Sequence, residues 1–242
     1  MINIKFIVLS CDKYLNSRCK AQRDSFLKNE KRIFLTDSSS FNGDDIIGYD
    51  TPQNYEGIQD KYISFFKNYS FDDSDYFFCI DDDTFVNLKN LNKLTLPDSN
   101  IPFCLHRICY LDQDAKDYHG NFTGYPLYKI TGVETQLPLM YPSGGSGFIL
   151  SKSACLNIQN FLNSTADSEI PRSAHGDVSI GFWMRSAKVS LIQTDLFWFD
   201  MPEKLYNHPF VDFGTEDESK SITFHYVSED NMFVLNNEYN YL

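Results

Sequence analysis

The sequence has few basic residues and few cysteines for its length. Its 242 residues include 21 Lys and Arg against 33 Asp and Glu, a formal net charge of −12. Binding to nucleic acid or to an anionic membrane depends on Lys and Arg, so neither partner is expected. The six cysteines form no Cys-x-x-Cys pair, which argues against a disulfide scaffold and a zinc site. We therefore expect cysteines that are reduced or simply buried.

A long hydrophobic run is also missing. The first residues, MINIKFIVLS, are apolar over only a few positions and have no basic flank. A signal peptide or a membrane anchor needs a longer apolar stretch. The N-terminus is therefore predicted to be the first strand of the fold, with no membrane segment in this chain.

Aromatic residues are abundant, and strand-like and helix-like segments alternate. Hydrophobic residues make up 42% of the chain and aromatic residues 16%, which favours one packed globular domain over residues 1–242. Alternating strands and helices predict an α/β fold, with a mixed, mainly parallel sheet flanked by helices. Residues 97–142 lack clear periodicity and predict long loops or a β excursion beside a site. The predicted strands cover residues 4–9, 32–36, 75–80, 189–193 and 221–226, and the predicted helices cover residues 18–28, 55–69, 88–94 and 151–162.

Three carboxylates follow one predicted strand. In YFFCIDDDTFV, Asp81, Asp82 and Asp83 come directly after a run of large apolar residues. Ligands of α/β sheets bind beyond the carboxyl ends of strands, and neighbouring carboxylates can share a hard divalent cation. Such a cation would offset the cost of placing these charges there. A solvated acidic turn is the alternative.

Two further stretches carry candidate site residues. In YPSGGSGFILSKSA, Gly144 and Gly145 permit a close approach of the backbone to a ligand, and Ser151 is a candidate N-cap for the next helix. A tight turn is the alternative for the glycines. In HGDVSIGFWM, Val178, Gly181, Phe182 and Met184 suit the buried side of a further helix, and Asp177 stands at its start, where it can act as a cap.

Four motifs together resemble one known family. FFCIDDDTFV, YPSGGSGFILSKSA, HGDVSIGFWM and ITFHYVSEDNMF occur in the order found in the Fringe-like and core 1 β1,3-galactosyltransferase-like glycosyltransferases. The resemblance extends from FIVLSCDKYLNSRCKAQRDSFL over nearly the whole chain. It implies a GT-A fold and a nucleotide-diphosphate sugar donor, expected to be a UDP-sugar, held through Mn²⁺ or Mg²⁺. It also implies inverting, β1,3-type transfer to a hydroxyl of a glycan or a glycosylated acceptor.

The resemblance also assigns roles to single residues. Asp81 and Asp83 match the ends of the Asp-x-Asp metal motif, and Asp82 would face the ribose or the sugar. Asp177 matches the catalytic base, although His175 and Gly176 stand where the family usually has an acidic neighbour. Glu169 and Asp167 are the reserve candidates for the base. His225 is the expected third metal ligand, with His208 in reserve.

The same resemblance places the nucleoside in the first half of the chain. It assigns residues 1–95 to nucleotide binding and residues 96–242 to the acceptor and catalysis. Ser10, Arg23, Asp37 and Lys61 are its candidate donor contacts, besides Asp82, Gly144 and Gly145. A basic residue on an amphipathic helix is more often simply solvated, which is the alternative for Arg23 and Lys61.

Other functions and locations stay open from the sequence. A non-catalytic carbohydrate-binding or chaperone-like protein on the same fold would not need the Asp triplet and Asp177 together. A metal-dependent phosphoesterase should have more His and Asp ligands around two ions. Because Met1 directly precedes the first strand, we expect a soluble cytoplasmic enzyme of microbial or viral source, or a Golgi-lumen enzyme if the chain is a trimmed piece.

Overall fold

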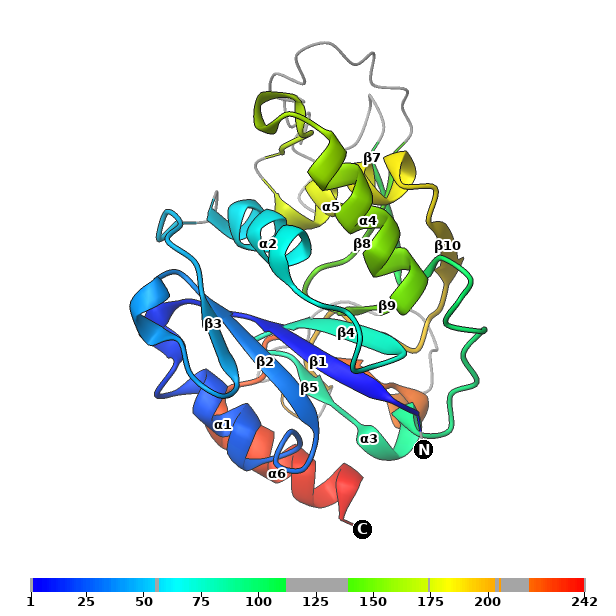
Figure 1. The fold of residues 1–242 in the computed structure, drawn as a ribbon. Coiled ribbons are helices and arrows are strands. Elements are labelled where there is room, and N and C mark those ends of the chain that lie inside the picture. Colours follow the sequence, from blue (N-terminus) through cyan, green and yellow to red (C-terminus); the bar gives the residue numbers. More distant parts are fainter. Residues whose placement is uncertain are drawn as a thin grey trace.

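The fold is built around one twisted sheet. The computed structural model describes residues 2–54, 57–111, 139–173, 175–202, 205 and 218–241. Within them, a seven-stranded sheet has the order β10-β6-β9-β4-β1-β2-β3 (Figure 1). Its strands are β1 (Ile4–Leu9), β2 (Lys31–Thr36), β3 (Ile46–Gly48), β4 (Tyr76–Asp81), β6 (Phe103–His106), β9 (Phe148–Ser151) and β10 (Ser190–Gln193).

The sheet is mixed and mainly parallel, as predicted. Strand β9 runs antiparallel to both neighbours, β4 and β6, while the other paired strands run parallel. The chain leaves the central strand β1 toward β2 on one side and later returns to β4 on the other. The crevice at such a reversal of strand order is where α/β sheets bind ligands.

Helices cover both faces of the sheet, and the strand sequences explain why. Side chains alternate between the faces, so along β4 Phe77 and Cys79 enter one core while Phe78 and Ile80 enter the other. Because each face is covered, β4 is apolar on both sides. In Figure 1, α2 (Gly57–Asn68), α4 (Lys152–Ser164) and α5 (Gly176–Ser186) lie on one face, and α1 (Arg18–Asp24), α3 (Leu88–Leu91) and α6 (Glu229–Asn240) lie on the other.

Two short antiparallel pairs lie outside the main sheet. One joins β7 (Ile108–Leu111) to β8 (Leu139–Pro142). The other joins β5 (Phe85–Val86) to β11 (Thr223–Phe224), with Phe224 opposite Phe85. The second pair brings the segment just before α6 next to the acidic triplet, which precedes β5.

The predicted elements are present, although several boundaries differ. The first predicted strand coincides with β1, but the last shortens to β11 because Tyr226 adopts a left-handed conformation with φ of 57°. The helix predicted over residues 18–28 ends at Asp24, where turns follow. The segment predicted to be loops or a β excursion contributes β6 to the main sheet, and it contributes β7 and β8 to the separate antiparallel pair.

Strands β3, β5 and β9 and helix α6 were not predicted. The three strands are three, two and four residues long, too short for periodicity to distinguish them from loops. Helix α6 has only weak amphipathic character, since Phe233 and Val234 are exposed. Its start did carry a signal, because Ser228 caps it and is followed by Glu229 and Asp230 in the first turn.

Ser151 joins the end of β9 to the start of α4, and we expect its removal to be costly. Its buried hydroxyl accepts from Ala154 N at 3.1 Å, as predicted for the N-cap, and donates to Ile101 O at 2.7 Å. The same oxygen also accepts from the buried N–H of Phe103 at 3.1 Å. Loss of the cap and an unpaired buried N–H should together lower the free energy of unfolding by about 1–3 kcal/mol in Ser151→Ala. Urea denaturation measures this change.

The neighbouring Ser153→Ala is the matched control for that variant. Ser153 lies inside the first turn of α4 and has no side-chain hydrogen bond within the described part of the chain. Alanine favours a helix, so the control should change stability by less than about 0.5 kcal/mol. Equal effects of the two substitutions would disprove the capping role.

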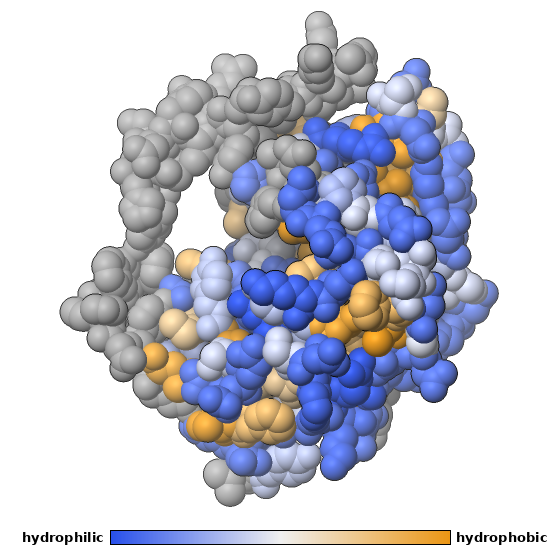
Figure 2. All heavy atoms as spheres, turned by 90° about the vertical axis from the view of Figure 1, so that its left-hand side faces the viewer, coloured by the Kyte–Doolittle hydropathy of each residue, from blue (hydrophilic) through white to orange (hydrophobic). Residues whose placement is uncertain are grey.

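Surface and cysteine chemistry agree with the composition. Figure 2 shows the face toward which the parallel strands point, where hydrophilic residues predominate and hydrophobic ones form small separate groups. All six cysteines are free, and four of them are buried. Among the described residues, no helix has both the length and the apolar character needed to span a bilayer.

Candidate active site

The acidic triplet lies at the crevice between β1 and β4. Asp81 is the last residue of β4 and pairs with Leu9, the last residue of β1. Asp82 is buried, whereas the side chains of Asp81 and Asp83 keep 31% and 19% exposure. The chain therefore presents two accessible carboxylates and one buried carboxylate at the end of a central strand.

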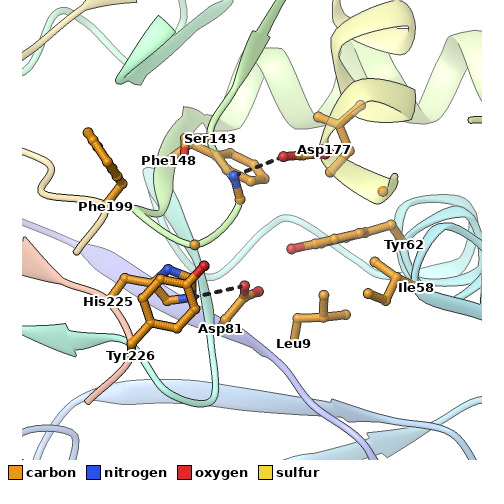
Figure 3. A pocket seen from close by; sticks show the side chains of 14 residues that line it. Leu9, Ile58, Tyr62, Asp81, Ser143, Phe148, Asp177, Phe199, His225 and Tyr226 are labelled. Carbon is orange, nitrogen blue, oxygen red and sulfur yellow. Dashed lines mark hydrogen bonds and ion pairs between the residues drawn. The ribbon is translucent and has the colours of Figure 1, made fainter. Parts of the chain in front are cut away.

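His225 completes a cluster with two of these carboxylates. Its Nε2 lies 3.2 Å from Asp83 Oδ1. The same atom lies 3.9 Å from Asp81 Oδ2, the contact drawn in Figure 3. One potential ligand atom from each of the three residues lies within 4.8 Å of the others. The position of His225 follows from the β5–β11 pairing and from Val227 N, which donates to Asp83 O at 2.9 Å. Two carboxylates and one imidazole form a donor set that could hold a divalent metal ion.

The proton affinities of this cluster reflect the crowding of charge. Burial, together with Asp83 and Asp82, raises the pKa of Asp81 to about 7. Burial also acts on Asp83, but the hydrogen bond and charge of His225 outweigh it and lower the pKa of Asp83. For His225, burial is outweighed by Asp83 and Asp81, which raise its pKa. A bound cation would favour ionised carboxylates and neutral imidazole instead.

Helix α1 supports the triplet with two side chains that the sequence analysis did not single out. Arg18 Nη1 donates to Asp82 Oδ1 at 3.0 Å and to Asp83 Oδ2 at 3.3 Å. Gln22 Nε2 donates to the carbonyls of Asp81 at 2.9 Å and Thr84 at 2.8 Å. Residues four apart share one face of a helix, and this spacing was the available signal for the pair.

A cavity of about 440 Å³ opens on the α1 side of the triplet, and we call it the α1-side cavity. Four predicted donor residues, Ser10, Asp37, Lys61 and Asp82, line it and are joined to one another. Lys61 Nζ donates to Ser10 O and to Asp37 Oδ1, each at 2.5 Å, and Ser10 Oγ donates to Asp82 Oδ2 at 2.6 Å. Lys61 and Asp37 thus form a buried ion pair that ties α2 to the ends of β1 and β2.

A second cavity, of about 240 Å³, lies on the other side of Asp81 beside α5 (Figure 3). We call it the α5-side cavity. Asp177 lies in its wall near the start of α5; its Oδ2 accepts from Gly144 N at 3.4 Å and its Oδ1 from Val178 N at 2.8 Å. Burial raises the pKa of Asp177 even though these two N–H groups oppose the shift. Asp81, His225 and Tyr226 line both cavities.

The glycines of the loop before β9 make room for the site's own side chains. A Cβ on Gly145 would lie 2.1 Å from His225 Cε1, and one on Gly144 would lie 3.4 Å from the Cβ of Asp177. Gly147 has φ of +79°, a conformation that favours glycine. The loop thereby contacts both the cluster and Asp177. A direct contact of Gly144 or Gly145 with a ligand stays a prediction.

Tyr226 covers the imidazole of the cluster. Its ring stacks on His225 at 3.8 Å between centroids, yet 59% of the residue is exposed. Its left-handed backbone is strained for a bulky side chain, and such strain is concentrated at functional sites. Tyr226 therefore forms an aromatic rim at the junction of the two cavities.

The remaining candidates do not join this arrangement. Arg23 is not among the residues lining the α1-side cavity; its guanidinium binds Asp45 instead. Positions five apart on a helix point about 140° apart, which separates Arg23 from Arg18. The reserve bases Asp167 and Glu169 are exposed and do not line the α5-side cavity. His208 lies outside the described residues.

Comparison with solved structures finds this fold in glycosyltransferases. One is a glycosyltransferase involved in the glycosylation of the major capsid of PBCV-1, with 11% identity, TM-score 0.51, 98% of this chain covered and 99% of the other. A second is the apo-form glycosyltransferase GlyE in Streptococcus pneumoniae TIGR4, with 12% identity, TM-score 0.50, and 100% and 61% coverage. At these identities the likeness establishes the fold alone.

A third similar structure is the catalytic domain of Drosophila beta1,4galactosyltransferase 7 in complex with xylobiose. It shares 12% identity at a TM-score of 0.40, with 81% of this chain covered and 66% of the other. The chain thus spans about two thirds or less of the Drosophila and pneumococcal chains. The comparison of this chain with curated protein sequences finds no match.

The family model described as Fringe-like matches residues 3–241. This match covers the strand ends, the glycine loop, the start of α5 and the segment carrying His225. Together with the mixed sheet and its structural neighbours, it confirms the resemblance and the GT-A fold expected from it. The chain therefore belongs to the Fringe-like family and has a GT-A glycosyltransferase fold.

Proposed function

We propose that this protein is a metal-dependent inverting glycosyltransferase that moves a sugar from a UDP-sugar to a hydroxyl of a glycan or glycosylated acceptor. The observation that carries the proposal is the three-residue cluster of Asp81, Asp83 and His225 at the junction of two cavities. Asp81 and His225 line both cavities, and Asp83 lines the α1-side cavity. A donor bridging the cavities would place its diphosphate at the cluster, its nucleoside on one side and its sugar on the other.

The residues present fit a divalent cation. Asp81 and Asp83 offer carboxylate oxygens and His225 offers Nε2, and they leave coordination positions for a ligand. When bound, Mn²⁺ or Mg²⁺ supplies positive charge that stabilises the departing diphosphate. Arg18 lines the α1-side cavity next to the cluster and adds a second cationic group on the nucleotide side.

Asp177 is the proposed base. It faces the α5-side cavity, where the acceptor hydroxyl must approach the sugar from the side opposite the diphosphate. Its carboxylate would take the proton of that hydroxyl as the new glycosidic bond forms and the bond to the diphosphate breaks. Inversion needs one such base, because the diphosphate leaves without a protein proton donor. The raised pKa brings the base closer to the operating pH.

The α1-side cavity would hold the nucleoside. Its size is within the range of small-ligand sites, and Ser10, Asp37 and Lys61 supply hydroxyl and charged groups in its wall. Asp82 is fixed by Ser10 and Arg18, so its role in this proposal is to position them rather than to bind metal. In this proposal residues 1–95 bind the nucleotide, and residues 96–242 carry out catalysis and bind the acceptor.

A thermal-shift screen of nucleotide sugars with Mn²⁺ tests the proposal. A ligand at about 100 times its Kd adds about 2.7 kcal/mol of stability, which for a chain of this size raises Tm by about 5–10 °C. We expect such a shift for UDP and for at least one UDP-sugar, and we expect EDTA to abolish it. The same screen with purified glycans and no nucleotide is the control.

The two alternative functions predict other outcomes. A non-catalytic carbohydrate-binding protein would respond to glycans and to no nucleotide. A phosphoesterase would hydrolyse the diphosphate of UDP-sugars and release UMP, whereas a transferase releases UDP. Either result would disprove the proposal.

A further inference from the structure

Tyr62 places an unpartnered hydroxyl inside the α5-side cavity. Tyr62 lies on α2, lines this cavity, and is only 3% exposed. The centroid of its ring lies 6.2 Å from that of Phe66 and 6.5 Å from that of Phe148. Figure 3 shows the hydroxyl pointing into the space between Asp177 and Asp81. The hydroxyl has no hydrogen bond to any residue that the structure describes.

Such an arrangement needs an explanation, because phenylalanine would fill the same space in the core. The hydroxyl oxygen is not one of the fully buried unpaired side-chain atoms of the described residues, so it is reachable from the cavity. Its partner there must be water or a ligand. The aromatic packing fixes the ring, so the hydroxyl is held at one point in the cavity before any ligand arrives. This is the property expected of a group that recognises a ligand.

The position of the hydroxyl suggests which part of the ligand it contacts. The cluster at Asp81 would hold the diphosphate, and Asp177 would receive the acceptor hydroxyl. The sugar ring must lie between these two carboxylates, because its anomeric carbon is joined first to the diphosphate and then to the acceptor oxygen. Tyr62 lines the α5-side cavity and not the α1-side cavity. Its hydroxyl thus faces the sugar rather than the nucleoside.

We infer that Tyr62 is a specificity-determining residue that hydrogen-bonds a hydroxyl of the sugar being transferred. The inference rests on the proposed glycosyltransferase function. It adds to that function the residue that selects which sugar is transferred. As both a donor and an acceptor, a phenolic hydroxyl pairs with a sugar hydroxyl in either sense. A site built this way discriminates against sugars that lack the hydroxyl or present it in the opposite configuration.

The test compares the binding of UDP with that of UDP-sugars in wild type and Tyr62→Phe. Calorimetry with Mn²⁺ uses UDP, UDP-glucose, UDP-galactose and UDP-N-acetylglucosamine. In wild type we expect one of these sugars to bind more tightly than UDP. In Tyr62→Phe, affinity for that UDP-sugar should fall by about tenfold, the value of one good hydrogen bond, while UDP affinity stays within about twofold. Tm should stay the same or rise.

Tyr69→Phe is the matched control. Tyr69 follows α2 in the same aromatic cluster, but its hydroxyl accepts from Lys5 Nζ at 2.8 Å and lies outside the cavity. Its loss should lower stability slightly and leave the ratio of UDP to UDP-sugar affinity unchanged. A merely structural role of Tyr62 would produce the same pattern.

The outcomes separate this inference from the function on which it rests. If wild type binds no UDP in the presence of Mn²⁺, the proposed function fails and the inference fails with it. If wild type binds UDP but Tyr62→Phe keeps the full preference for the UDP-sugar, only the inference is overturned. A variant with unchanged donor binding and a raised KM for the acceptor overturns it too, since the hydroxyl then contacts the acceptor.

Discussion

Replacing Asp177 with asparagine is expected to lower the rate of glycosyl transfer by about two to four orders of magnitude, the usual contribution of a general base. Asparagine keeps the size of the side chain and one oxygen, which can still accept from Val178 N, while the longer bond from Gly144 N to the second oxygen is lost. We therefore expect α5 to start at the same place. Asparagine lacks the basicity needed to take the acceptor proton. Single-turnover transfer with saturating acceptor measures the loss.

The pH profile gives a second readout of the same variant. Burial raises the pKa of Asp177, so the wild-type rate should begin to fall at a higher pH than an ordinary aspartate would cause. Below that pKa the ionised fraction drops about tenfold per pH unit, and so should the rate. This acidic limb should be absent from the residual activity of Asp177→Asn.

Asp167→Asn provides the matched control for Asp177→Asn. It makes the same chemical change at an exposed carboxylate that pairs with Lys67 and lies outside the cavity. Transfer should remain within about twofold of wild type, as expected for a surface substitution away from the site. Substantial turnover by a folded Asp177→Asn, with a large loss in Asp167→Asn or Glu169→Gln, would move the base to η3 (Asp167–Glu169).

Replacing Asp83 or His225 with alanine is expected to remove metal-dependent binding of UDP. Even residues that only orient metal ligands commonly contribute about 10- to 100-fold in metal affinity, so removing a ligand should cost more than about 100-fold. Calorimetry should show this loss in Asp83→Ala and in His225→Ala. With Mn²⁺ present, UDP should bind these variants no more tightly than it binds wild type with EDTA.

Two controls accompany the metal-ligand variants. Asp75→Ala changes a carboxylate just before the opposite end of β4, which hydrogen-bonds the Asn3 side chain at 3.2 Å, and should leave binding unchanged. His208→Ala tests the reserve ligand and should also retain metal. An unchanged Kd in Asp83→Ala would disprove the metal assignment, and a loss of metal in His208→Ala alone would replace His225.

Local sequence patterns were enough for four strands of the main sheet, β1, β2, β4 and β10, and for the acidic site. Phe77–Ile80 is apolar at every position, which predicts a strand buried on both faces, and three aspartates can follow such a strand only where it leaves the core. The helix signals of α2 and α4 were equally local, with hydrophobic positions three and four apart in one and Ser151 capping the other. The motif order added the family.

The helix residue that supports the cluster could not be chosen from sequence. Both Arg18 and Arg23 lie on the predicted helix, and both would be reasonable partners for a diphosphate. Which one faces the aspartates depends on the rotation of α1 about its axis, and its packing against the sheet and α6 sets that rotation. The amphipathic pattern of seven residues is too short to define the angle.

The sequence by itself determined the single α/β domain, the strand that ends in carboxylates, the position of Asp177 at a helix start and the family. Each of these depends on neighbours along the chain or on motif order. Only the tertiary structure decided three contacts. His225 contacts Asp83 beside Gly145, Arg18 forms an ion pair with Asp82, and the hydroxyl of Tyr62 faces the α5-side cavity. These contacts join segments far apart in sequence, and their geometry is set by how the helices and the short β5–β11 pair pack on the sheet, which no local periodicity encodes.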